Sequence, residues 1–62
     1  MKVEELFPFI QDNEVVLYRQ VGLLEFDYLF KGRKEIMSKE LFWLDIKRLG
    51  SLDYRVLDIE VM

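Results

Sequence analysis

The sequence contains no cysteine and no histidine. Without cysteine there is no disulfide framework, and without either residue type the usual zinc, iron and copper sites lack their preferred ligands. The missing histidine also removes the base that activates serine in hydrolytic triads. Ser38 and Ser51 are the two serines, and we assign them to a helix cap and a turn. We therefore expect a protein that is not an enzyme, with no catalytic residues, cofactor or metal.

Long apolar runs are also missing. No stretch approaches the roughly 20 apolar residues of a membrane span, and the N-terminus lacks the basic and apolar segments of a secretory signal. We therefore expect no membrane association and a cytoplasmic location. The net charge of -3 disfavours a dedicated nucleic-acid binder, because such proteins usually carry a basic surplus.

The chain does have large apolar side chains. Hydrophobic residues make up 52% of its 62 residues and include five Phe, three Tyr and one Trp. A chain of this length buries only about 60% of the surface that it exposes when unfolded, so large side chains must supply the core. We expect residues 1–62 to form one small domain of marginal stability.

The order of patterns predicts an α+β fold. Acidic residues at positions 4 and 5 and apolar residues at helical spacing favour a short helix over residues 3–7. The helix either places Pro8 in its first turn or ends near Phe7 and continues as an irregular or 3₁₀ turn. A run rich in β-branched and aromatic residues predicts a strand at 14–19. Apolar alternation predicts strands at 23–30, 42–47 and 56–61, with a helical turn at 38–41 and a turn at Gly50 and Ser51. Short connections favour antiparallel neighbours, so we expect a short N-terminal helix packed on a three- to four-stranded antiparallel sheet.

The two faces of this sheet are both rich in apolar residues. Strict alternation places a large set on the side that the helix covers: Val15, Leu17, Leu24, Phe26, Tyr28, Phe30, Phe42, Leu44, Ile46, Leu57, Ile59 and Val61. The other side still holds Val16, Tyr18, Leu23, Leu29, Trp43 and Val56. Three occupants remain open for that second side: another segment of the chain, a second copy in a homodimer, or a different protein.

Seven residues of the second side are candidates for contact with a partner. Tyr18, Leu29 and Trp43 would be the apolar contacts, because aromatic residues dominate interface hot spots. The carboxylates would form a polar rim or imitate nucleic-acid phosphates: Glu25, Asp27, Asp58 and Glu60. Glu25 with Asp27, and Asp58 with Glu60, are also spaced so that each pair points the same way, but the solvated side of a strand explains this better than a magnesium site.

Basic residues suggest one rival function. Lys31, Arg33 and Lys34 surround Gly32 in a turn that could bind phosphate, and Lys47 with Arg48 could extend such a surface. The turn lacks the remainder of any phosphate-binding motif, so we favour a solvated hairpin turn. A small nucleic-acid-binding accessory protein and a self-associating structural subunit remain the alternative functions.

Several segments together resemble the short uncharacterised proteins that bacteriophages and prophages encode. The segments are the opening Lys2, Val3, Glu5 and Leu6, the run 14–18, the sequence Phe30-Lys31-Gly32-Arg33 and the closing run 57–61. The resemblance spans most of the chain and transfers no functional residue. It implies a non-enzymatic accessory protein of the host cytoplasm that binds and inhibits or modulates a larger host protein, such as a CRISPR-type defence nuclease.

Overall fold

The computed structural model describes residues 1–53 and 55–62 of the chain. Within these residues, one short α-helix and three 3₁₀-helices accompany a four-stranded sheet, which is an α+β architecture. The elements in chain order are α1 (Val3–Leu6), η1 (Phe7–Phe9), β1 (Glu14–Gln20), β2 (Phe26–Gly32), η2 (Lys34–Ile36), η3 (Lys39–Trp43), β3 (Ile46–Asp53) and β4 (Val56–Val61).

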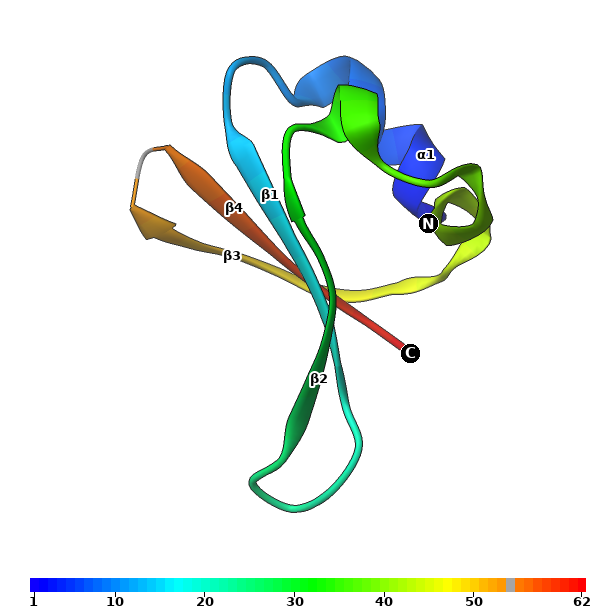
Figure 1. Ribbon diagram of the computed structural model, residues 1–62, viewed down its shortest axis with the longest axis vertical. Coiled ribbons are helices and arrows are strands. Elements are labelled where there is room, and N and C mark those ends of the chain that lie inside the picture. Colours follow the sequence, from blue (N-terminus) through cyan, green and yellow to red (C-terminus); the bar gives the residue numbers. More distant parts are fainter. Residues whose placement is uncertain (54) are drawn as a thin grey trace.

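The sheet has the strand order β2-β1-β4-β3. β1 and β2 pair antiparallel, as do β3 and β4, whereas the central strands β1 and β4 are parallel. The α+β class is therefore confirmed, but the expectation of a purely antiparallel sheet is wrong. Short connections enforce antiparallel pairing only between consecutive strands. Here two hairpins meet along β1 and β4, which are far apart in the sequence (Figure 1).

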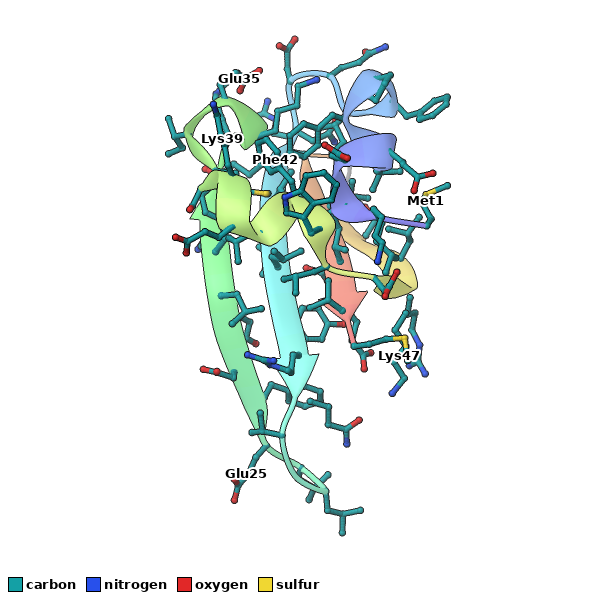
Figure 2. The ribbon with its side chains drawn as sticks, turned by 90° about the vertical axis from the view of Figure 1, so that its right-hand side faces the viewer. Met1, Glu25, Glu35, Lys39, Phe42 and Lys47 are labelled. Carbon is teal, nitrogen blue, oxygen red and sulfur yellow. The ribbon has the colours of Figure 1, made fainter. Side chains whose placement is uncertain are left out.

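A helical layer covers the upper part of one face of this sheet (Figure 2). It consists of α1, η1 and the segment 33–45, which connects the two edge strands β2 and β3 and lies in front of the strands in Figure 2. The amide of Val3 donates to the carbonyl of Leu44 at 3.0 Å, and the ring of Phe7 meets that of Phe42 edge-on with centroids 4.9 Å apart. These contacts hold the N-terminus and the connection together as one layer.

The N-terminal helix follows one of the two alternatives that the sequence left open. It ends at Leu6 and continues as η1, which carries Pro8 near its start. The carboxylate of Glu5 accepts a hydrogen bond from the amide of Lys2 at 3.0 Å, which caps one of the free N–H groups at the helix N-terminus. Pro8 fits the first turn of η1, where its missing N–H removes no helical hydrogen bond.

The hydrophobic core lies between the helical layer and the sheet. Its buried members are apolar side chains from both: Val3, Leu6, Ile10, Val15, Leu17, Met37, Ile59 and Val61. β1 and β4 supply alternate residues to this core, as the sequence pattern predicted for the two central strands. None of the helices in residues 1–53 and 55–62 has the length and apolar character needed to cross a membrane.

The prediction of a strand at residues 42–47 is wrong. Residues 39–43 form η3, and β3 begins only at Ile46 and runs through Gly50 and Ser51, which were expected to form a turn. Leu41 and Leu44 both pack against the core, and the three-residue period of a 3₁₀-helix places them on the same side. The apolar residues therefore fit a 3₁₀ turn as well as a strand. Ser38 does occupy the N-cap position of η3, but its side chain makes no capping hydrogen bond.

The second strand starts later than alternation predicted. Leu23 and Leu24 belong to the connection between β1 and β2, where the side-chain amide of Gln20 donates to the carbonyls of Gly22 at 2.9 Å and Leu23 at 3.0 Å. At its other end, β2 includes Gly32, which has a φ of 149° and so adopts a conformation that glycine tolerates best. The chain turns into η2 only after this residue.

A β-bulge in β2 overturns the predicted assignment of its two faces. Leu17 pairs with Phe30, but the next residue of β1, Tyr18, pairs with Tyr28, so Leu29 is an extra residue in β2. Alternation is interrupted there, and Leu29 and Phe30 both pack against the core. Tyr28 consequently lies on the opposite face, although strict alternation placed it in the core with Phe30.

Candidate interaction surface

The face of the sheet turned away from the helical layer, which we call the outer face, carries side chains from all four strands. Its rows follow from the strand register: Lys31, Val16, Asp58 and Gly50 form one row, and Tyr28, Tyr18, Glu60 and Arg48 form the next. Neighbouring strands lie about 4.8 Å apart, so adjacent members of a row are in contact distance. Charged and aromatic side chains therefore share this face.

Three aromatic rings cluster at the β1–β2 side of the outer face. The ring centroid of Tyr18 lies 5.7 Å from that of Phe26, in an edge-on arrangement, and 6.0 Å from that of Tyr28. Tyr18 is partly buried by its neighbours, whereas Phe26 and Tyr28 are largely exposed. Rings at these separations attract one another beyond simple area burial, so they form a preordered apolar surface.

A shallow cavity of about 220 Å³ lies against this cluster. Its lining combines the three rings with an aliphatic and an acidic side chain: Val16, Tyr18, Phe26, Tyr28 and Asp58. Asp58 has Val16 as its neighbour on β1 and Gly50 on β3, and Gly50 has no side chain to cover it. Within residues 1–53 and 55–62, Asp58 takes part in no ion pair. The cavity thus presents an unneutralised carboxylate beside aromatic faces.

The second carboxylate of the outer face is neutralised. Glu60 is 4% exposed, and its oxygens lie 3.4 Å from Nζ of Lys47 and 4.0 Å from Nε of Arg48. A register shift between Ile46 and Arg48 makes Lys47 an extra residue in β3, which lets two consecutive cations reach one acid.

The phenol of Tyr18 lies between these two carboxylates. Its pKa is raised, first because burial disfavours the phenolate, and then because Glu60 and Asp58 are negatively charged. Arg48 acts in the opposite direction, and its effect is smaller than that of either acid. Burial and both acids thus favour the neutral phenol of Tyr18 over its phenolate.

The β1–β2 hairpin ends in an apolar tip, formed by Val21, Leu23, Leu24 and Phe26. Leu23 and Leu24 are 88% and 86% exposed, and Val21 and Phe26 are also exposed. The hairpin projects beyond the helical layer, with Glu25 near its end (Figure 2). Adjoining apolar side chains that protrude together into water are typical of protein-interaction sites.

The structure brings together only some of the predicted contact residues. Tyr18, Asp58 and Glu60 lie on the outer face as neighbours. Leu29 does not, because the bulge directs it toward the core. Trp43 is 65% exposed but belongs to η3 in the helical layer, on the other side of the sheet.

The remaining predicted acids are also separated from the outer face. Glu25 precedes β2 in the hairpin connection, where its carbonyl accepts a hydrogen bond from the amide of Val21 at 3.0 Å. Asp27 pairs with Arg19, which alternates with Tyr18 and so lies on the opposite face. β1 separates β2 from β4, so the two acidic pairs do not face each other on adjacent strands. Among the described residues there is no cluster of three or more acids that could hold a metal ion.

The three cations of the predicted phosphate-binding turn lie apart from one another. Nζ of Lys34 donates to the carbonyls of Phe7 at 2.8 Å and Ile10 at 2.6 Å, so this cation satisfies the end of η1. Arg33 lies 3.9 Å from Asp12 and lines a second, polar cavity, whereas Lys31 lies on the outer face beside Val16. The three cations point to different neighbours and do not form one surface.

Sequence reasoning missed Phe26, Tyr28 and Leu24 as surface residues because it assigned all three to the core. One signal was available: a helix of four residues cannot cover a face that holds so many large side chains. A comparison of the chain with protein-family models, curated proteins and solved structures finds no match to any of them.

Proposed function

We propose that this chain is a non-enzymatic interaction domain that binds a larger protein through its outer face and its apolar tip. The observation that carries the proposal is the tip itself, where Leu23 and Leu24 are held almost fully in water at the end of a hairpin. Exposure of adjoining leucines is unfavourable, and burial of each in a partner would contribute about 1.5–3 kcal/mol. A partner groove that accepts the hairpin would remove this cost.

The aromatic cluster extends the same surface. Phe26 belongs to the tip and also contacts Tyr18, so the apolar area continues from the end of the hairpin onto the sheet. Aromatic side chains with a polar end are the residues that most often anchor protein interfaces. Tyr18 and Tyr28 have this character, and Asp58 would belong to the polar rim.

The narrower proposal concerns the partner's identity and the effect of binding. We propose that the partner is a host protein, such as a CRISPR-type nuclease, and that binding inhibits or modulates it. Support for this step comes from the sequence resemblance to phage and prophage accessory proteins, together with the residues of the interaction surface.

The test replaces the tip leucines and compares the result with two matched variants. The double variant Leu23→Lys and Leu24→Lys should lose the proteins that the wild-type chain captures from a bacterial lysate, measured by quantitative mass spectrometry. Ile36→Lys introduces the same change at an exposed aliphatic residue of η2 and should retain them. For a purified partner, the Kd of the double variant should rise at least about tenfold.

The third variant, Trp43→Ala, distinguishes the two sides of the molecule. If Trp43→Ala removes the partner and the leucine variant retains it, binding occurs on the helical layer and the proposal is wrong. Analytical ultracentrifugation of the wild-type chain tests the competing occupant, since self-association that the leucine variant abolishes would make the tip a homodimer contact.

A further inference from the structure

We infer that the cavity formed by Val16, Tyr18, Phe26, Tyr28 and Asp58 binds an arginine side chain, which the larger partner supplies. This inference rests on the proposed function for the source of the arginine. It adds the chemistry of the contact, which the apolar tip does not specify.

The first argument is the composition of the lining. Aromatic faces attract cations through their quadrupoles, and here Tyr18 and its two neighbours border one cavity of about 220 Å³. Asp58 lines the same cavity, so an entering cation can contact the rings and a carboxylate together. A guanidinium group suits both the rings and the carboxylate, because its plane stacks on an aromatic ring while its N–H groups donate to a carboxylate.

The second argument is that Asp58 forms no ion pair within the described residues of this chain. Glu60 has Lys47 and Arg48 as ion-pair partners, but Asp58 has none among residues 1–53 and 55–62. Lys31 is the other cation of the outer face, and it lies across Val16 from Asp58 without lining the cavity. A partner arginine would give Asp58 the neutralisation that Glu60 already has.

The third argument is the acidic charge beside Tyr18 at the cavity wall. Both acids next to Tyr18 disfavour its ionisation, and their effects each exceed the opposing effect of Arg48. Glu60 already has two cations, so a cation that enters beside the ring is stabilised by the charge of Asp58, which lines the cavity. An anionic or acidic ligand would be repelled by this carboxylate.

The test titrates the chain of residues 1–62 with Nα-acetyl-arginine amide as the probe and monitors binding by NMR spectroscopy. The ring signals of Tyr18 and Tyr28 and the amide signal of Asp58 should shift in a saturable manner. Uncharged N-acetyl-citrulline amide should bind at least about tenfold more weakly, since it keeps the shape and loses the cation. Nα-acetyl-lysine amide should also bind more weakly, because its ε-ammonium group cannot stack on a ring and pair with a carboxylate at the same time.

Two carboxylate variants give a matched comparison. Asp58→Asn should weaken binding of the arginine probe about threefold to tenfold, because the amide keeps the shape and removes the charge. Asp27→Asn makes the same change on the opposite face and should leave the affinity unaltered. Tyr28→Leu provides a second route to weaker binding at an exposed residue, in case the Asp58 variant perturbs the sheet.

Three results would overturn the inference: equal affinity for arginine and citrulline probes, unaltered binding by Asp58→Asn, or shifts confined to other parts of the chain. Lysine binding as tightly as arginine would also contradict the choice of side chain. Failure of the proposed function is a separate result, because it is measured by the leucine variants and the partner, while the probe titration needs no partner. Conversely, a partner that requires the leucines but tolerates Asp58→Asn would retain the proposed function without the arginine contact.

Discussion

Replacement of Lys34 by methionine should destabilise the fold measurably, because this side chain joins η2 to the end of η1 within the helical layer. Its ammonium group donates to the carbonyls of Phe7 at 2.8 Å and Ile10 at 2.6 Å. A hydrogen bond to a charged group contributes about 1.5–3 kcal/mol. Both bonds are only partly buried, so solvent reduces each to about 1 kcal/mol and their joint loss should cost about 2 kcal/mol.

The assay is urea unfolding of Lys34→Met, with thermal unfolding as a second measurement. For a domain of this size, a loss of about 2 kcal/mol lowers Tm by roughly 8–16 °C. Lys39→Met, at an exposed residue of η3, is the matched control and should change stability by less than about 0.5 kcal/mol. If Lys34→Met also stays within about 0.5 kcal/mol, water replaces the ammonium group at these carbonyls and the reasoning is refuted.

Two further predictions concern stability as a function of pH. Burial and then the negative charges of Glu60 and Asp58 raise the pKa of Tyr18 above 10.0. Between pH 10.0 and this raised pKa, the folded state therefore keeps a proton that the unfolded state has lost. The free energy of unfolding should therefore fall as pH rises above 10.0. Urea unfolding at a series of alkaline pH values should show a smaller fall for Tyr18→Phe than for the wild type. An equal fall in both proteins would contradict the prediction. The pKa of Asp45 is lowered from 3.8 by its hydrogen bond to Lys2 and by the charge of Lys2, at an Nζ to Oδ1 distance of 2.9 Å. The stabilisation by this pair is present above pH 3.8 and is lost as pH falls through the lowered pKa of Asp45. The free energy of unfolding of Lys2→Met should therefore not show this loss when it is measured at acid pH.

Local sequence patterns predicted the two central strands well. β1 is rich in β-branched and aromatic residues, β4 alternates apolar with acidic residues from Leu57 to Val61, and their paired members Leu17 and Ile59 are both fully buried. A strand in the middle of a sheet has a neighbour on each side, so its pattern reflects burial directly. The short helix that leads into a 3₁₀ turn at Pro8 was also one of the two predicted forms.

The pairing of the strands could not be deduced in the same way. A parallel pair between β1 and β4 depends on where the connection 33–45 crosses, and nothing in either strand specifies this. The crossing requires the chain to leave the sheet after Gly32 and to return at Ile46, and it carries Met37 and Phe42 onto the core. Because apolar residues at 42, 44 and 46 pack well in either conformation, alternation alone could not distinguish a strand from this crossing.

The interaction surface itself depends on the single extra residue Leu29 in β2. Without it, Phe26 and Tyr28 would share the side of Phe30, which the helical layer covers only at the upper part of the sheet (Figure 2). The bulge instead turns both rings toward Tyr18, so the same insertion that fills the core with two adjacent side chains also creates the aromatic cluster. A bulge leaves no reliable mark in a single sequence, since each residue on either side of it still alternates. The core and the candidate binding site are thus linked through one backbone irregularity, and a sequence reading that keeps strict alternation must place Phe26 and Tyr28 of this site on the wrong face.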